Sequence, residues 1–315
     1  MAGDVSTRRF FRVSEPSGAT CVVMDYGVPF RDDPDDVRLA RVFAAAGLPV
    51  ARVLEAAPDA GCLVLEDLGD RTLEDVLDGA SRSLGRGSPA SRGLYLAATD
   101  LAAAIATRGT EALSGSDRAA GPALDPQRFR FEMDFFVENY LGRLLGVAPP
   151  AGLREALHDL AERAASGRRV FCHRDFHSRN LMIRPDGRLA MVDIQDARWG
   201  PDGYDLASLL RDAYVDDPDP LLEEMVERFH ATVPGLGSAS EFRGRFDVVA
   251  TQRMVKALGT FGFQIAALGR TRYRSAIPRT LARLSASMPA VEGCAALHRM
   301  LDDLGLFVPP SANEA

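Results

Sequence analysis

The stretch VFCHRDFHSRNLMIRPDGRLAMVDIQDARWG, residues 170–200, joins a polar loop to a short apolar hairpin. Asp175 precedes Asn180 by five residues, and Asp193 follows after two apolar runs that flank the turn Pro-Asp-Gly. Such a turn predicts that the two runs fold back on each other as antiparallel strands. We therefore expect Asn180 and Asp193 to face each other at the open end of the hairpin.

The loop 173–180 has the spacing H-R-D-x-x-x-x-N of a kinase catalytic loop, which a metal-binding aspartate follows after a hairpin. Phosphoryl transfer needs a carboxylate near the attacking hydroxyl, and it needs oxygen ligands for the Mg²⁺ that neutralises charge on the nucleotide phosphates. On this basis Asp175 is the predicted base, and Asn180 and Asp193 are the predicted Mg²⁺ ligands.

Two simpler interpretations compete with this one. Aspartate and asparagine are common in turns for local reasons, which would account for any one of these residues but not for their joint spacing. His173 and His177 are four residues apart and could bind zinc on a helix, but loop backbone and the lack of a suitably placed glutamate disfavour that site. We expect His173 to be a packed, hydrogen-bonded core histidine.

The first part of the chain favours strands, and the rest favours helices. Residues 9–25 predict a hairpin, 35–46 a helix, and 51–57 and 62–69 two further strands, which gives the order β-β-α-β-β. Apolar residues then recur at helical spacing in six segments, 72–77, 94–108, 129–145, 153–166, 221–233 and 243–268.

Two segments predict irregular structure. Residues 81–93, rich in Ser, Gly and Arg, predict a loop, and the tail 308–315 predicts disorder. The whole pattern predicts an α+β, bilobal, protein-kinase-like fold. Its small β-rich N-lobe would span 1–69 with a hinge at 66–69, and its larger, mainly helical C-lobe would span 70–315 and carry the catalytic loop.

The composition narrows the possible partners. The chain has 315 residues, a formal net charge of −7 and a pI of about 5.4, which argues against a broad basic surface for nucleic acid or anionic membrane. Its four cysteines lack C-x-x-C spacing, and no apolar run has the length of a membrane span. We expect a cytoplasmic protein, a monomer or weak dimer, that binds small molecules.

The catalytic stretch resembles the aminoglycoside phosphotransferase and choline kinase group, whose loop usually has the form H-G-D-x-H-x-x-N, followed by I-D-x-x-D. The corresponding segments here are HRDFHSRN and VDIQD. Within that group the chain looks most similar to the bacterial anomeric kinases of N-acetylmuramate and N-acetylglucosamine. The segments GDVSTRRFFRV, LVLEDLG, DIQDARWGPDGYDLASLLRD and QRMVKALGTFGF carry this likeness, which extends over nearly the whole chain.

The resemblance implies roles for further residues. It implies ATP binding through a phosphate loop, the hinge and the adenine face, with contacts from Gly3, Asp4, Ser6, Thr7, Arg8, Glu66, Leu68 and Met182. It also implies that Asp205 braces the catalytic loop through backbone hydrogen bonds, with His173 as a second support. An N-cap role for Asp205 would explain the same position.

The sugar contacts are expected around the cleft, from Arg179, Gln195, Asp196, Asp134 and Glu138. Arg179 could pair with the lactyl carboxylate of N-acetylmuramate, or it could equally brace the catalytic loop. Asp134 and Glu138 lie i, i+4 on one predicted helix, where a solvated acidic face is the simpler explanation.

The chain departs from the kinase pattern in one respect. Kinases of this fold carry a lysine on the third strand that contacts the nucleotide phosphates, but the only lysine here is Lys256, far along the chain. Met24 stands near the expected position. Arg8 and Arg12 share one face of the first predicted strand and could reach the nucleotide, or they could be charges on a solvated edge strand.

Taken together, the resemblance implies ATP- and Mg²⁺-dependent phosphorylation of the anomeric C1 hydroxyl of an N-acetylated amino sugar, giving a sugar 1-phosphate in cell-wall sugar recycling. One alternative is a kinase of another small metabolite or antibiotic, of the aminoglycoside or choline type. A second alternative is a nucleotide-binding pseudokinase, which the missing strand lysine favours and the intact set of Asp175, Asn180 and Asp193 disfavours.

Overall fold

The computed structural model describes residues 8–14, 16, 18–31, 34–84, 87–114, 123–216 and 219–307. Four predicted nucleotide contacts, Gly3, Asp4, Ser6 and Thr7, lie outside these residues, as does the tail 308–315.

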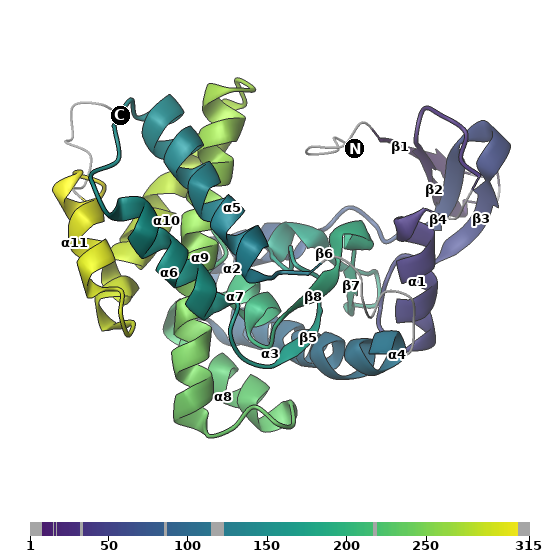
Figure 1. Ribbon diagram of the computed structural model, residues 1–315. Coiled ribbons are helices and arrows are strands. Elements are labelled where there is room, and N and C mark those ends of the chain that lie inside the picture. Colours follow the sequence, from purple (N-terminus) through teal and green to yellow (C-terminus); the bar gives the residue numbers. More distant parts are fainter. Residues whose placement is uncertain are drawn as a thin grey trace.

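The N-terminal part forms an antiparallel sheet with one helix against it, at the right of Figure 1. The sheet order is β1-β2-β4-β3, and the elements are β1 (Arg9–Ser14), β2 (Thr20–Asp25), α1 (Asp35–Ala45), β3 (Val53–Ala57) and β4 (Cys62–Glu66). Met24, Val37 and Leu63 form the core between sheet and helix. The predicted order β-β-α-β-β is therefore correct.

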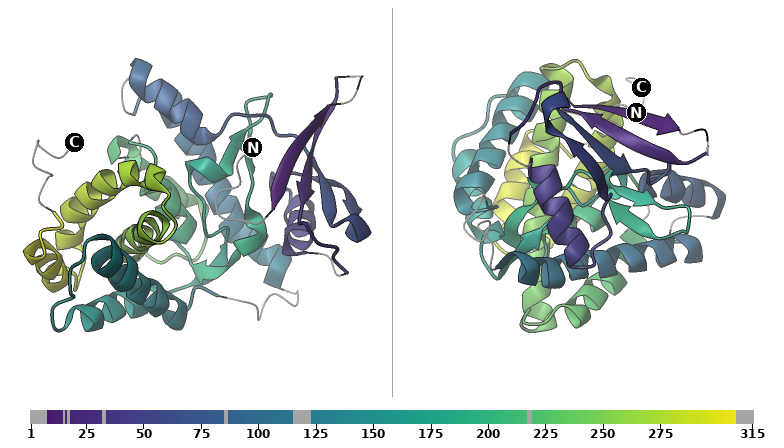
Figure 2. Two further views of the ribbon diagram at one scale, coloured as in Figure 1. Left: turned by 90° about the horizontal axis from the view of Figure 1, so that it is seen from above. Right: turned by 90° about the vertical axis from the view of Figure 1, so that its right-hand side faces the viewer.

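The remainder is mainly helical and carries two short two-stranded sheets. Its helices are α2 (Leu73–Leu84), α3 (Pro89–Ala104), α4 (Thr110–Ser114), α5 (Pro126–Phe136), α6 (Leu153–Ala164), α7 (Tyr204–Leu210), α8 (Leu222–Thr232), α9 (Ala239–Ala266), α10 (Ile277–Ser287) and α11 (Ala295–Asp303). Its strands are β5 (Arg169–Cys172), β6 (Leu181–Ile183), β7 (Leu189–Met191) and β8 (Arg198–Pro201), paired as β5-β8 and β6-β7. The small β-rich lobe and the larger helical lobe of Figures 1 and 2 confirm the predicted α+β bilobal fold.

The long helix α9 is the central helix of the C-lobe. A capping box starts it, because the Ser238 hydroxyl accepts from the Glu241 N–H while the Glu241 carboxylate accepts from the Ser238 N–H. Gly259 and Gly262 then let α9 approach α5 and the π-helical segment Val137–Leu144 that continues it. A Cβ at Gly259 would lie 2.8 Å from the Phe136 Cα, so a larger residue there would push the helices apart.

The loop predicted at 81–93 is largely wrong. Helix α2 continues to Leu84, and α3 already begins at Pro89. The Ser88 hydroxyl caps α3 by accepting from the Ser91 N–H at 3.3 Å, and proline suits the first helical position because its missing N–H would have no partner there. The Ser-Pro pair was therefore a helix start, although the composition resembled that of a loop.

Within the described residues, none of the helices combines the length and the apolar character needed to cross a membrane.

Candidate active site

The predicted hairpin brings Asn180 and Asp193 to the same end of a two-stranded ribbon. Strands β6 and β7 pair antiparallel, and just beyond them the Val192 N–H donates to the Asn180 carbonyl at 3.0 Å. Asp193, the next residue, has a φ of 62°, in the left-handed region. The backbone therefore turns sharply at Asp193, directly beside Asn180.

A buried aspartate in the first turn of α7 fixes the backbone of the catalytic loop. Asp205 accepts hydrogen bonds from the His173 N–H at 2.7 Å and from the Arg174 N–H at 2.9 Å. Burial raises the pKa of Asp205, and His173 and these backbone donors oppose that rise. Arg174 has a φ of 81°, in a region that costs a non-glycine residue roughly 1–2 kcal/mol. The two hydrogen bonds thus hold a backbone conformation that an arginine disfavours.

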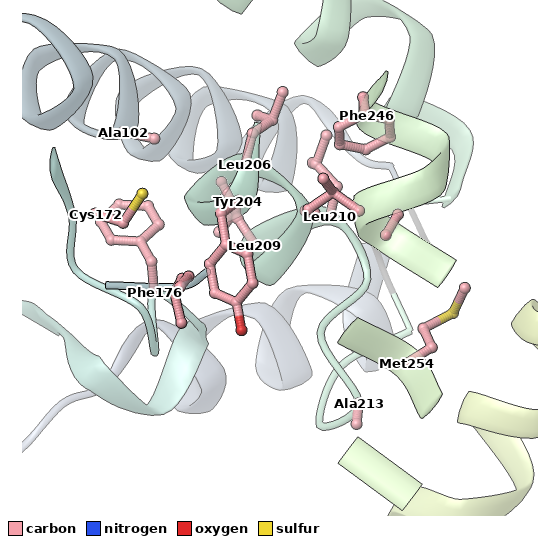
Figure 3. Packing of buried hydrophobic residues seen from close by; sticks show 14 of the residues in the cluster. Ala102, Cys172, Phe176, Tyr204, Leu206, Leu209, Leu210, Ala213, Phe246 and Met254 are labelled. Carbon is pink, nitrogen blue, oxygen red and sulfur yellow. The ribbon is translucent and has the colours of Figure 1, made fainter. Parts of the chain in front are cut away.

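Apolar side chains anchor the same loop. Phe176 is fully buried in the main core cluster together with Tyr204 and Leu209 of α7 (Figure 3). His173 is also buried, and its Nε2 lies 2.9 Å from the Val192 carbonyl. The described part of the chain shows no group of three His, Cys, Asp or Glu side chains able to hold a metal.

Three cations surround the carboxylate of Asp175. Lys256 Nζ lies 3.3 Å from Oδ1, Arg253 Nη1 lies 3.9 Å from Oδ1, and Arg174 Nη1 lies 3.9 Å from Oδ2. Burial alone would raise the pKa of Asp175, but Lys256, Arg174 and Arg253 outweigh it and hold this pKa well below its usual range. The side chain is nevertheless 26% exposed, so an ionised carboxylate remains accessible to a reactant.

Asn180 and Asp193 have the chemistry of a Mg²⁺ site. The Asn180 amide donates from Nδ2 to the Asp175 carbonyl at 2.9 Å, which leaves its Oδ1 as the atom that can bind a cation. The Asp193 side chain is 50% exposed, and its Oδ1 accepts from the Gln195 amide at 2.6 Å. One carboxylate and one amide oxygen suit Mg²⁺, which takes few protein ligands and completes its shell with phosphate oxygens and water.

The predicted adenine contacts lie close together. Leu68 and Met182 are buried in one small cluster with Ala190, at the junction between the β4 exit and the β6–β7 hairpin. Glu66 is engaged by its neighbours: its N–H donates to the Arg52 carbonyl at 2.9 Å, and its carboxylate pairs with Arg52 and with Arg184.

Arg12 of β1 and Arg8, the residue before β1, have separate partners. Arg12 pairs with Asp67 at 2.6 Å and with Asp70 at 2.5 Å, so it fastens β1 to the hinge. Arg8 pairs with Asp36 of α1 at 2.8 Å, and its Nη2 lies 3.6 Å from Asp193 Oδ1. Of the two, only Arg8 lies at the predicted metal site.

The predicted sugar contacts on the catalytic segment are all engaged with other side chains. Arg179 binds both carboxylate oxygens of Glu74, at 2.7 and 2.9 Å, and its guanidinium lies 3.6 Å from the centre of the Tyr214 ring. These contacts favour the loop-bracing alternative. Gln195 faces Asp193, as described above. Asp196 pairs with Arg174 at 3.1 Å and with Arg198 at 2.8 Å.

The predicted acidic contacts on α5 and on the π-helical segment that continues it do not face Asp175. Asp134 pairs with Arg154 at 2.7 Å and with His158 at 3.1 Å, both on α6, and Glu138 is exposed. This placement agrees with the simpler explanation of a solvated helix face.

A family model described as "Phosphotransferase enzyme family" matches residues 1–242. The chain belongs to this family. It is 32% identical to the N-acetylmuramate/N-acetylglucosamine kinase of Pseudomonas aeruginosa, over 96% of this chain and 87% of that protein. It is 29% identical to the protein of the same name from Neisseria meningitidis, over 89% of this chain and 82% of that protein.

Solved structures share the fold of this phosphotransferase. A choline/ethanolamine kinase family protein from Mesorhizobium loti superposes with a TM-score of 0.54 at 19% identity, covering 94% of each chain. An ethanolamine kinase of Plasmodium vivax gives 0.62 at 12% identity, covering 92% of this chain and 82% of that one. The family match and the kinase names of the two curated relatives, rather than these structures, show that the protein is a kinase that transfers phosphate to a hydroxyl acceptor.

The sequence did not predict the residues that α5 and α9 contribute to this phosphotransferase site. Arg253 and Lys256 of α9 reach Asp175, and Gln252 of the same helix donates to the buried Glu132 of α5 at 3.0 Å. Burial lowers the pKa of Lys256, and the nearby Asp175 opposes that effect. The available signal was the placement of the only lysine in a helix rich in apolar residues, where a cation needs a partner.

Proposed function

We propose that this kinase uses ATP and Mg²⁺ to phosphorylate the anomeric C1 hydroxyl of an N-acetylated amino sugar, N-acetylmuramate, N-acetylglucosamine or both, within cell-wall sugar recycling in the cytoplasm. The observation that carries the proposal is the set of three cations around Asp175. The names of the curated relatives supply the sugar class.

The low pKa of Asp175 makes it a weak base, and this suits an acidic acceptor. The anomeric hydroxyl of a sugar is more acidic than an ordinary alcohol, so it needs less help to lose its proton. The pKa of Asp175, which the surrounding cations hold well below its usual range, is therefore consistent with such an acceptor.

The charges also discriminate between acceptor classes. Lys256, Arg253 and Arg174 would repel the ammonium groups of choline or an aminoglycoside at the position where the acceptor must lie. A neutral sugar meets no such penalty, and the lactyl carboxylate of N-acetylmuramate would be attracted. The alternative of a choline- or aminoglycoside-type kinase is therefore disfavoured, and the kinase-named relatives leave the pseudokinase alternative without support.

In the proposed reaction Asp175 accepts the proton of the C1 hydroxyl while the oxygen forms a bond to the γ-phosphorus and the bond to ADP breaks. Mg²⁺ held by Asn180 and Asp193 would neutralise charge on the β- and γ-phosphates. Asp205 keeps the Asp175 backbone in place through its hydrogen bonds to the two preceding residues. Fixed geometry and fixed charge supply most of the rate in this class of reaction.

The test is ADP release with Mg²⁺-ATP and one acceptor at a time: N-acetylmuramate, N-acetylglucosamine, glucose, choline and an aminoglycoside. We expect turnover of the N-acetylated sugars, loss of that turnover in Asp175→Asn, and a phosphorus NMR coupling to the proton on C1 of the product. Turnover of choline or the aminoglycoside in preference to the sugars would refute the proposal, as would phosphate on another carbon.

A further inference from the structure

The strand position that carries the phosphate-binding lysine in kinases is part of the apolar core here. Met24 of β2 is 3% exposed and packs with Val37 of α1 and Leu63 of β4. Lys256 cannot replace the missing lysine, because it lies on α9 in contact with Asp175. The cation that positions the nucleotide phosphates must therefore come from another part of the chain.

Arg8 forms an ion pair with the helix of the N-lobe. Its Nη1 donates to both carboxylate oxygens of Asp36, at 3.0 and 2.8 Å, and the two side chains are only 14% and 15% exposed. Asp36 lies in the first turn of α1, where the helix N-terminus stabilises a negative charge. The Tyr26 hydroxyl donates to Asp36 Oδ2 at 2.6 Å. The Tyr26 hydroxyl and the helix N-terminus thus stabilise the carboxylate that holds Arg8.

The other end of the guanidinium faces the predicted metal site. Arg8 Nη2 lies 3.6 Å from Asp193 Oδ1, just beyond hydrogen-bond distance, and Asp193 is 50% exposed. A planar guanidinium has separate donors, so one amino group can stay on Asp36 while the other binds a phosphate oxygen. In kinases the strand lysine makes these same two contacts, to an acidic residue of the N-lobe helix and to the phosphates.

We propose that Arg8, held by Asp36 and Tyr26, is the phosphate-positioning cation of this kinase in place of the strand lysine. The proposal rests on the proposed ATP-dependent function and assigns Arg8 to the β- and γ-phosphates rather than to adenine or the sugar. Asp36 and Tyr26 are positioning residues, because they act through Arg8. The cation comes from the residue before β1 instead of from β2, so the core position at Met24 is released for apolar packing.

The test compares binding of Mg²⁺-ATP, Mg²⁺-ADP and adenosine by calorimetry with no sugar present, in the full chain and its variants. Arg8→Gln is expected to weaken the binding of ATP and ADP by about ten- to a hundredfold, the range for hydrogen bonds to charged groups. The binding of adenosine should stay unchanged. Tyr26→Phe should weaken ATP by a smaller factor, also without an effect on adenosine. Arg8→Lys keeps the charge without the fork and should restore part of the ATP affinity.

Arg9→Gln is the matched control. Arg9 is the next residue, is 67% exposed and pairs with Asp25 instead of facing the metal site, so its variant should bind all three ligands as the wild type does. Wild-type ATP affinity in Arg8→Gln would overturn the proposal, and so would an equal loss for ATP and adenosine, which would indicate damage to the lobe. Because no acceptor is present, these ratios are independent of whether the wild type phosphorylates an N-acetylated sugar.

Discussion

Asp175 and Asp193 come from one segment of the chain, yet their surroundings differ in kind. Asp175 is 26% exposed and has three cations of the C-lobe within 3.9 Å. Asp193 is 50% exposed, and near it are the neutral Gln195 amide and Arg8 of the N-lobe. The C-lobe thus supplies a permanent positive field to Asp175, the proposed base, whereas Asp193, the proposed metal ligand, is left open to a cation. In the proposed reaction these surroundings suit different roles, because Asp175 would accept a proton and Asp193 would bind Mg²⁺.

Removing the base gives the largest expected effect and tests one side of this comparison. Asp175→Asn should lower kcat by about 10²- to 10⁴-fold, the contribution of a positioned general base. The affinity for Mg²⁺-ATP should change little, because Asn180 and Asp193 remain. Steady-state kinetics with an N-acetylated sugar and calorimetry with the nucleotide measure both quantities. Comparable losses in kcat and in nucleotide affinity would show that the two carboxylates do not have separate roles.

Removing one cation from the base gives the next largest effect. Lys256→Met should lower kcat/KM by about tenfold, the worth of one charged hydrogen bond. Lys256 helps to hold the pKa of Asp175 below its usual range, so its loss should raise that pKa and move the acid limb of the pH profile to higher pH. Lys256→Arg is the control that keeps the charge. An acid limb that stays in place in Lys256→Met would mean that Arg253 and Arg174 alone keep the base ionised.

The same comparison explains what the sequence could predict. The catalytic segment could be predicted because its chemistry depends on local spacing. The loop and the hairpin bring Asp175, Asn180 and Asp193 together within a short stretch of the chain. The cations around Asp175 could not be predicted from the sequence, because Lys256 and Asp175 are 81 positions apart in the chain. That contact depends on the docking of α9 against α5, which Gly259 permits and which no local pattern reveals.

Helix α5 and the π-helical segment that continues it show the same limit on a smaller scale. Asp134 and Glu138 have the i, i+4 spacing that attracts attention, but Glu132 is the acid of this helix that faces α9. Which of these acids faces α9 depends only on the rotation of the helix about its axis. The apolar residues of α5 lie on more than one side, so they do not fix that rotation.

Arg179 offers a test of the difference between bracing and sugar binding. Arg179→Met removes the paired hydrogen bonds to Glu74 and the contact with Tyr214, so the free energy of unfolding should fall by about 1–2 kcal/mol. The KM for N-acetylmuramate should stay within about twofold, since RT ln 2 is below the worth of a hydrogen bond. Urea unfolding and steady-state kinetics measure these values. A large rise in KM for N-acetylmuramate alone, with unchanged stability, would restore Arg179 as a contact to the lactyl carboxylate.

Arg174 gives the smallest expected effect and separates backbone strain from charge. Its φ of 81° suits glycine, the residue that the related loop pattern H-G-D carries at this position. Both Arg174→Gly and Arg174→Ala remove the cation near Asp175, so both should raise the pKa of that carboxyl and lower kcat/KM alike. Only glycine relieves the strain, so the glycine variant should unfold at higher urea than the alanine variant, by about 1 kcal/mol in free energy. Equal stability of the two variants would mean that the hydrogen bonds donated to Asp205 do not impose this conformation. Equal pH profiles with unequal stability would show that Arg174 contributes separately through its charge near Asp175 and through the strain of its backbone.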